Sequence, residues 1–430
     1  MKINHKKLVV ILSVATILKV IIILGFYQNV IDYEGPKPKI TSGYGWDQLV
    51  DAIYKGKYEM QIQSGLNGLY NFNSKSYRPP VYPLFLFVST YLGHYSALVL
   101  VILQSIITSL VAIISYMIVK FSTKTDGRAF LCLAALFLLP MNFLKSGSID
   151  EEPLFIIFLL GFVLIFGRFI RNQEKLAYLF FSGILLGLST LTRYTSILVS
   201  FYFLPFLFFN RLIWEKRLKK IIIFYVSYLI ILAPWLIRNY SLYCKLVLSS
   251  GSGRILFVTL SNDFINLFPA KSIDIIERDF LRKYYKSHQY FRNLDEVSTD
   301  REFHRLAINK IKRSPYLLYR SMLTKLKVFI PTGYYPTQNN MLKNIVFLLT
   351  YYMLVISFII SLFSFNRSIF ENKMILIVLT AVFTPGVVYF MLSRHFYVPF
   401  VLIIIFSCIN FPLRVVKDCL LHKGEAFSIK

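Results

Sequence analysis

The sequence predicts an all-α, polytopic membrane protein with about ten transmembrane helices. Of its 430 residues, 56% are hydrophobic and only 16% are charged, and the mean hydropathy is +0.57. The apolar residues come in blocks of roughly 17 to 25, the length that a helix needs to cross the hydrocarbon core of a bilayer. A single soluble core does not hold so much apolar surface, so the blocks are expected to span the membrane.

The formal net charge of +26 would suggest nucleic-acid binding in a soluble protein, but its distribution along this chain does not. Much of this charge lies beside the apolar blocks, where lysine and arginine fix the orientation of a helix and contact anionic membrane lipids. This distribution argues against nucleic-acid binding. The cysteines show neither metal-ligand spacing nor a disulfide framework: they are Cys132, Cys244, Cys408 and Cys419. We expect no cofactor and no dedicated metal site, which leaves participation of a divalent metal open.

The chain is expected to begin in the cytosol. Lys2, Lys6 and Lys7 precede the apolar residues 8–26, and the positive-inside rule places such a basic end in the cytosol. No small-residue cleavage site follows, so this block is interpreted as an uncleaved first span rather than a signal peptide.

The first loop, residues 27–96, is then extracytoplasmic. From Trp46 onward its apolar pattern predicts a short amphipathic helix. Residues 81–92 are apolar but too short to cross a bilayer, so they are expected to form a juxtamembrane helix or a half-span.

The other spans follow from the alternation of apolar blocks with basic loops. The expected spans are residues 8–26, 97–119, 130–144, 155–169, 176–191, 194–209, 221–237, 345–365, 374–392 and 398–411. Both chain ends are expected in the cytosol, and the protein in a plasma or inner membrane.

A less apolar stretch interrupts the spans. Helical patterns at 273–285 and 300–312 predict a mainly helical, extracytoplasmic insert. The chain thus divides into an N-terminal membrane module (1–239) that contains the first loop, the insert (240–340), and C-terminal helices with a cytosolic tail (341–430).

Acidic and basic side chains gather at or near the outer ends of the expected spans. These residues are remote from one another in sequence, but the expected topology places them at the same level, near the outer membrane surface. They are Asp32, Asp47, Arg78, Asp150, Glu151, Glu152, Arg193, Arg238, Arg394 and His395. Acids and arginines on one membrane face, with a soluble insert over them, fit a site for a phosphate-bearing lipid. A transporter instead needs charges and broken helices near the midplane, and this sequence shows little of either.

Plainer interpretations of several charged residues stay open. Lys19, the main charge inside a span, is interpreted as snorkelling to an interface, with a contact to lipid phosphate as the alternative. Asp47 fits the solvated face of a surface helix, and the acids at 150–152 fit the positive end of the next helix dipole. Arg193 and Arg238 fit ordinary interfacial anchors. Arg394 and His395 fit an anchor of the last hairpin, and the histidine alone does not indicate a metal. Residues 250–254, Ser-Gly-Ser-Gly-Arg, resemble a phosphate cradle, but a flexible loop is expected because neither a strand before them nor a helix after them is predicted.

Six short motifs resemble those of a known family. They occur in the expected order: Trp46-Asp47-x-x-Val50, Arg78-Pro79-Pro80-x-Tyr82-Pro83, Glu152-Pro153-Leu154-Phe155, Gly187-Leu188-Ser189-x-Leu191-Thr192-Arg193, Pro234-Trp235-x-x-Arg238-Asn239 and Arg394-His395-x-Tyr397-x-Pro399. In these motifs the chain resembles the integral-membrane glycosyltransferases of the GT-C fold. This class includes protein O-mannosyltransferases and the lipid A aminoarabinose transferases, described as family 39 or as RgtA/B/C/D-like. The resemblance covers most of the chain up to about Phe411.

The resemblance implies transfer of a sugar from a polyprenyl-phosphate donor to a lipid, glycan or protein acceptor on the extracytoplasmic face. It assigns the lipid phosphate to Arg78 first, followed by Arg193, Arg238, Arg394 and His395. Arginine suits this role because its planar fork holds two phosphate oxygens and stays charged.

A carboxylate is implied to deprotonate or orient the acceptor hydroxyl. The family usually has an aspartate one helical turn before the first-loop aromatic, where this chain has Ser42. Asp32 and Asp47 are the nearest substitutes, with Glu34 behind them, and Glu152 is a further catalytic candidate. Either the loop brings one of these acids into place, or the protein is a divergent, even inactive, member.

Two rival classes also stay open. A polysaccharide polymerase or ligase shares the lipid-linked chemistry and a large outer loop, but it is not expected to carry the Arg78-Pro79-Pro80 element. A flippase or transporter of lipid-linked sugars is expected to show pseudo-symmetric repeats, which we do not find in the sequence.

Overall fold

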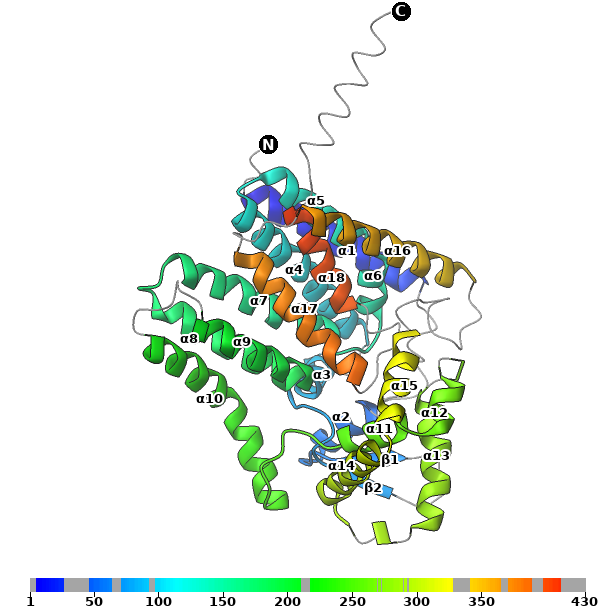
Figure 1. Ribbon diagram of the computed structural model, residues 1–430. Helices are drawn as coiled ribbons and strands as arrows, with labels where there is room; N and C mark the ends of the chain where they lie inside the picture. Colours follow the sequence, from blue (N-terminus) through cyan, green and yellow to red (C-terminus); the bar gives the residue numbers. More distant parts are fainter. Residues whose placement is uncertain are drawn as a thin grey trace, which may run out of the picture.

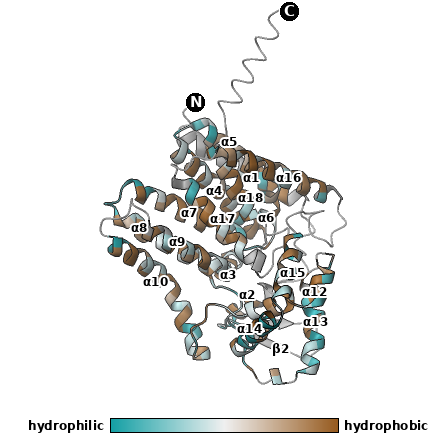
Figure 2. Cartoon of the chain, viewed as in Figure 1, coloured by the Kyte–Doolittle hydropathy of each residue, from teal (hydrophilic) through white to brown (hydrophobic). Residues whose placement is uncertain are grey.

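Figure 1 shows the computed structural model, in which a bundle of long helices lies above a layer of shorter helices and strands. The structure describes residues 5–410 except 27–45, 64–70, 93–96, 210–216, 269, 272, 289, 292–293, 328–340, 365–369 and 389–396. The bundle contains α1 (His5–Phe26), α4 (Ala97–Thr123), α5 (Asp126–Leu138), α6 (Pro140–Gly147), α7 (Glu152–Arg171), α8 (Leu176–Thr192), α9 (Ile197–Phe209), α10 (Arg217–Tyr243), α16 (Met341–Phe363), α17 (Phe370–Val388) and α18 (Tyr397–Asn410). Most of their length is hydrophobic (Figure 2).

The bundle confirms a multi-pass membrane protein. Among the described residues, four helices are long and apolar enough to cross a bilayer, and α5 with α6 makes a fifth if this bent pair is one span. Shorter apolar helices accompany them, including α8 and α18. Each expected span overlaps a helix of the bundle, but the number of ten crossings stays a prediction.

The span expected at 130–144 corresponds to two helices, because the helix breaks before Pro140. There α5 and α6 meet at an angle of 52°. Proline has no N–H to donate to the carbonyl of Leu136, four residues earlier. The Asn142 side chain donates to that carbonyl instead, at 2.8 Å, and Tyr397 donates to Asn142 at 3.0 Å. Side chains of the bundle therefore supply the hydrogen bond that the Leu136 carbonyl loses at the break.

Lys19 lies inside the bundle, so the interpretation of a snorkelling side chain is wrong. Its exposed fraction is 1%. The ammonium group donates to Thr108 of α4 at 2.9 Å, and Thr108 shares a 2.6 Å hydrogen bond with Ser146 of α6. The rings of Phe137 and Phe143 lie 5.7 and 5.8 Å from it. Lys19 thus links three helices of the bundle.

Two glycines of α8 bring its backbone against α10. A Cβ on Gly183 would lie 2.5 Å from the Phe224 carbonyl oxygen, and one on Gly187 would lie 2.8 Å from the Cβ of Ile231. Glycines four residues apart allow membrane helices to approach closely. The pairing runs in the same direction along both helices, so their C-terminal ends lie at the same end of the bundle.

At the other end of the bundle, basic side chains bind carbonyls at helix ends. Arg128 of α5 donates to the Ile409 carbonyl of α18 at 2.8 Å. Arg171 of α7 donates to the Phe121 carbonyl of α4 at 2.7 Å. These contacts bring together helix ends that the sequence assigns to the cytosol; the end with the C-termini of α8 and α10 is called the site end below.

The lower layer combines the first loop with the insert (Figure 1). The first loop contributes α2 (Trp46–Tyr54), the antiparallel strands β1 (Met60–Gln63) and β2 (Asn71–Ser74), and α3 (Val81–Leu92). The insert contributes α11 (Ser252–Thr259), α12 (Asn262–Leu267), α13 (Ile273–Ser287), α14 (Glu296–Arg313) and α15 (Pro315–Leu326). Helices α13 and α14 confirm the predicted helical patterns. The two strands were not predicted, and α10 continues to Tyr243, past the expected start of the insert.

Each part of this layer has its own apolar contacts. In the insert, Phe257, Phe291 and Phe303 belong to one core, and the rings of Phe291 and Phe303 stack 4.8 Å apart. In the first loop, Leu49 of α2 packs in a cluster with Tyr82 of α3. Both parts of the layer therefore have packed apolar cores, which can hold the polar side chains around them in fixed positions.

Candidate functional site

The acidic start of α7 forms a buried ion-pair cluster. Glu152, whose side chain is 1% exposed, lies 2.6 Å from the Arg193 guanidinium and 2.9 Å from the Lys145 ammonium group. Lys145 is itself buried and also pairs with Asp150. Three helix ends, those of α6, α7 and α8, thus meet through charged side chains. Removing one partner of such a cluster leaves a buried charge uncompensated.

Arg193 stays charged in this cluster. Burial by itself would lower the pKa of Arg193, but the Glu152 and Glu151 carboxylates raise it, so the net pKa lies above the usual value. The side chain is 21% exposed, so the protein does not seal the guanidinium completely. Arg193 is therefore a charged, partly exposed side chain at the site end.

Arg238 fastens the first loop to α10. Its Nη1 donates to the Lys75 carbonyl at 2.9 Å, and its Nη2 donates to the Tyr58 carbonyl at 3.0 Å. Its guanidinium carbon lies 5.0 Å from the centre of the Tyr58 ring and 4.7 Å from that of Trp235. Cation–π contacts and two backbone acceptors together fix the orientation of this arginine.

Arg78 lies where the first loop enters α3. Its carbonyl accepts a hydrogen bond from the Tyr58 hydroxyl at 3.1 Å, and its guanidinium carbon lies 5.2 Å from the centre of the Tyr77 ring. Burial raises the pKa of Tyr58, and nearby Arg238 and Arg78 only reduce this rise. Tyr58 is therefore a protonated donor at neutral pH, and it joins Arg78 and Arg238 in one cluster.

Tyr194 connects this arginine cluster with the acidic one. It follows Arg193 in the chain and interacts electrostatically with Tyr58 and Arg238. The structure thus brings Arg78, Arg193 and Arg238 to the same end of the bundle, with Glu152 beside Arg193.

The remaining predicted site residues are not placed by the structure. Asp32, Arg394 and His395 lie outside the described residues. Asp47 is the second residue of α2, but its side chain also lies outside them. Within the part of the chain that the structure describes, no three His, Cys, Asp or Glu side chains come together to hold a metal ion.

Glu296 is a residue of this end that the sequence analysis missed. Its carboxylate accepts five hydrogen bonds, from the Ser74 hydroxyl, the Lys75 and Ser76 amides, the Tyr243 hydroxyl and the Ser250 hydroxyl. Its partner Ser74 lies 222 residues away in sequence, which no local pattern reveals. The one available signal was an acid at a helix start, and this is ordinarily explained by the helix dipole.

The segment Ser250 to Arg254 begins a helix, so the expectation of a flexible loop is wrong. Gly251 has a φ of +102°, which favours glycine, and it immediately precedes α11. Asp300 of α14 accepts hydrogen bonds from the Gly253 and Arg254 amides at 2.8 and 3.1 Å. The Asp300 carboxylate therefore occupies the place that a phosphate would take in a cradle.

One family profile matches the chain. It describes dolichyl-phosphate-mannose-protein mannosyltransferases and matches residues 77–237, a segment that contains Arg78, Glu152 and Arg193. No curated protein matches the chain in sequence.

Solved structures of an archaeal oligosaccharyltransferase share the fold of this chain. AglB, an oligosaccharyltransferase from Archaeoglobus fulgidus in complex with an inhibitory peptide and a dolichol-phosphate, has a TM-score of 0.56 at 14% identity, and the match covers 98% of this chain and 52% of that one. The apo form of the same organism's oligosaccharyltransferase has a TM-score of 0.57 at 16% identity, covering 99% and 52%. ArnT from Cupriavidus metallidurans bound to undecaprenyl phosphate has a TM-score of 0.43 at 13% identity, covering 95% and 79%. The chain spans about half the length of the archaeal proteins it matches.

Proposed function

Because the chain has the GT-C fold of integral-membrane glycosyltransferases, we propose that it transfers a sugar from a polyprenyl-phosphate donor to a lipid, glycan or protein acceptor. The matched segment, residues 77–237, supports this proposal. The dolichol-phosphate in the AglB complex supports a lipid phosphate as the donor's leaving group.

The convergence of Arg78, Arg193 and Arg238 carries the proposal. As the bond between the anomeric carbon and the phosphate oxygen breaks, negative charge grows on the departing phosphate. Guanidinium groups fixed beforehand stabilise that charge at little cost in reorganisation. In our proposal Arg78 binds the phosphate, Arg193 adds a second cation that Glu152 orients, and Arg238 holds the first loop in place.

An acid of the first loop is proposed to serve the acceptor. The acceptor hydroxyl passes its proton to a carboxylate while its oxygen forms the new bond to the anomeric carbon. Asp47 and Asp32 are our candidates for this base. Glu152 is the weaker candidate since Arg193 and Lys145 hold both of its oxygens. Arg394 and His395 are proposed as further phosphate ligands.

The site is proposed to face the extracytoplasmic side of a plasma or inner membrane. The bundle end with Arg128 and Arg171 is the one that the positive-inside rule assigns to the cytosol. The Arg78 and Arg238 cluster lies at the opposite end, next to the insert.

A flippase for lipid-linked sugars is the second candidate, and one observation favours it. The break between α5 and α6 is a feature that transporters use at their binding sites. A transferase joins donor and acceptor in detergent micelles, where there is no membrane to cross, whereas a flippase does not.

Arg78→Ala tests the proposed function. Mass spectrometry of lipid extracts from cells with and without the gene first identifies the sugar donor and the acceptor. We then expect the purified variant in detergent to lose transfer by a factor on the order of 100 or more, the usual cost of removing one group that stabilises transition-state charge. Arg171→Ala, at the other end of the bundle, is the matched control and should transfer at the wild-type rate. An unchanged rate for Arg78→Ala would remove this residue from the mechanism.

A further inference from the structure

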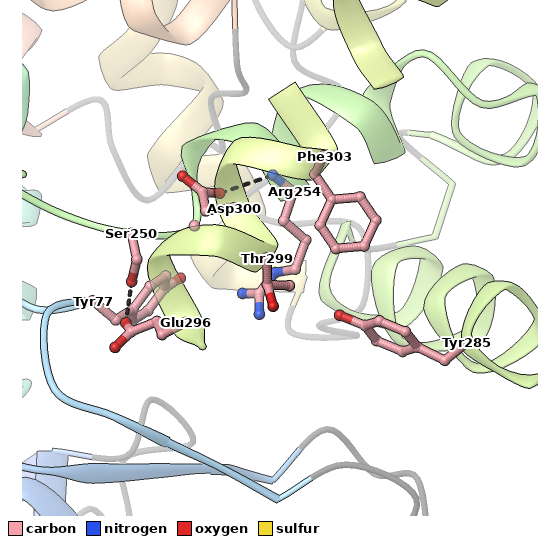
Figure 3. A pocket seen from close by; sticks show the side chains of 9 residues that line it. Tyr77, Ser250, Arg254, Tyr285, Glu296, Thr299, Asp300 and Phe303 are labelled. Atoms are coloured by element: carbon pink, nitrogen blue, oxygen red, sulfur yellow. Dashed lines mark hydrogen bonds between the residues drawn. The ribbon is translucent and has the colours of Figure 1, made fainter. Parts of the chain in front are cut away.

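A pocket opens between the first loop and the insert, next to the arginine cluster. Tyr77 of the first loop, Arg254 of α11, Tyr285 of α13 and Thr299 and Phe303 of α14 contribute to its lining. Figure 3 shows these side chains converging from separate elements. The pocket is partly open to solvent.

Thr299 indicates that this pocket takes a hydrogen-bonding ligand. Its side chain is 6% exposed, yet its hydroxyl oxygen has no hydrogen-bond partner in the protein. Buried hydroxyl groups normally form hydrogen bonds, because burying one without a partner lowers the stability of the fold by its full desolvation cost. A ligand oxygen in the pocket would supply the partner.

The charges of the pocket disfavour an anionic ligand. Arg254 is neutralised by Glu277, whose carboxylate lies 2.6 Å from it. Glu296 and Asp300 also line the pocket, so carboxylates outnumber cations. Backbone amides hold the Asp300 and Glu296 carboxylates in place at the pocket. This electrostatic balance suits a neutral, hydroxyl-rich group and not a phosphate.

The aromatic walls suit the apolar face of a sugar ring. The Tyr77 ring rests on Gly251, where an added Cβ would lie 2.6 Å from it. The same ring lies 5.2 Å from the guanidinium carbon of Arg78 and 5.7 Å from that of Arg254. Tyr77 is therefore a wall shared by the pocket and the proposed phosphate site.

We infer that this pocket binds one uncharged sugar ring of the acceptor, which makes the acceptor a glycan. This inference rests on the proposed function, because only a transferase needs an acceptor beside Arg78. Tyr77 and Phe303 contact the ring faces, and Thr299 hydrogen-bonds a ring substituent. The pocket holds the acceptor while the lipid phosphate lies on the other side of Tyr77.

Saturation-transfer NMR on the full-length protein in nanodiscs tests the pocket. The probes are the methyl glycosides of glucose, galactose and mannose, with inorganic phosphate as a separate ligand. Thr299→Val keeps the shape of the side chain but removes the hydroxyl, so we expect roughly threefold to tenfold weaker glycoside binding, the usual worth of one neutral hydrogen bond. Thr259→Val is the matched control, because Thr259 is equally buried in the insert but donates to the Leu256 carbonyl outside the pocket.

Four results would overturn the inference: no glycoside binds, phosphate displaces the glycoside, both variants bind as the wild type does, or both lose binding to the same extent. Equal thermal midpoints of the two variants exclude a general loss of folding. Transfer assays separate this inference from the proposed function. If the wild type transfers sugar but Thr299→Val leaves the KM for the acceptor unchanged, the pocket assignment fails alone. If glycosides bind through Thr299 but no transfer occurs, the proposed function fails and the sugar site remains.

Discussion

The two ends of the helix bundle use the same kinds of charged residue in different ways. At the end assigned to the cytosol, Arg128 and Arg171 each donate to a helix-end carbonyl, and the ion pair of Lys120 with Asp126 is open to solvent. At the site end, Glu152 and Lys145 have side chains only 1% and 3% exposed. The Lys120–Asp126 pair at the first end is thus solvated, whereas the Glu152–Lys145 pair at the second is desolvated.

Contacts between remote segments occur at both ends of the bundle. At the end assigned to the cytosol, Arg128 reaches the Ile409 carbonyl across 281 residues, and at the site end Arg238 reaches the Lys75 carbonyl across 163. The difference between the ends lies in the burial of the ion pairs. Buried charges are costly unless fully paired, so the buried pairs of Glu152 support our proposal that the chemistry takes place at the site end.

Glu152→Gln should have the largest effect on stability. It keeps the shape of the side chain but leaves the buried Arg193 without its 2.6 Å partner, so we expect a loss of about 3 to 5 kcal/mol together with most of the transfer activity. Thermal unfolding in detergent and the transfer assay measure the two effects. Arg171→Ala should cost less than about 1 kcal/mol, the usual worth of one exposed hydrogen bond. Equal losses in the two variants would contradict the distinction between the ends.

Glu296→Gln should have an intermediate effect that acts through the first loop. The amide offers one acceptor oxygen where five donors now share two, and its NH₂ group faces the Lys75 and Ser76 amides. We expect transfer to fall roughly tenfold, with a loss of about 1 to 3 kcal/mol for unsatisfied buried groups, and faster proteolysis within the first loop.

Glu302→Gln controls for that variant on the same helix. Glu302 pairs with Arg305 on the exposed face of α14, away from the first loop. It should behave like the wild type in both assays. A first loop that is equally protected in Glu296→Gln and in the wild type would show that Glu296 does not position it.

Lys325→Met should have the smallest effect on transfer and act through pH. Burial lowers the pKa of Lys325 in α15 to about 7, while an unfolded lysine titrates near about 10.4. Between these values the unfolded chain binds more protons than the folded one, so the wild type should gain stability as the pH rises from about 7 to about 10. The variant should lack that part of the slope, as measured by the thermal midpoint at each pH. Identical slopes would show that Lys325 stays charged in the fold.

The sequence predicts the helices and the site end well because both depend on local signals. Blocks of apolar residues mark helices, and basic loops mark one face, so Arg78, Arg193 and Arg238 could be assigned to a common end before any contact was known. Pro140 was also visible inside the block 130–144, and its missing N–H was sufficient reason to expect a break. The pairing of Asn142 with the freed carbonyl was not visible.

The contacts that assemble the site depend on distant partners and could not be predicted. Lys19 donates a hydrogen bond to Thr108, 89 residues away in sequence. Glu296 accepts one from Ser74, 222 residues away. Charge alone does not reveal such a partner, so Lys19 was expected at an interface and Glu296 was overlooked. The strands β1 and β2 were not predicted either. Each is only four residues long and is defined by its pairing with the other strand.

Gly183 and Gly187 also set the separation of two arginines that lie beyond them. Because these glycines bring α8 and α10 together without intervening side chains, a larger residue at either position would force the two helices apart. Arg193 directly follows α8 and Arg238 lies in the last turns of α10, so we expect such a change to increase the distance between the two guanidinium groups.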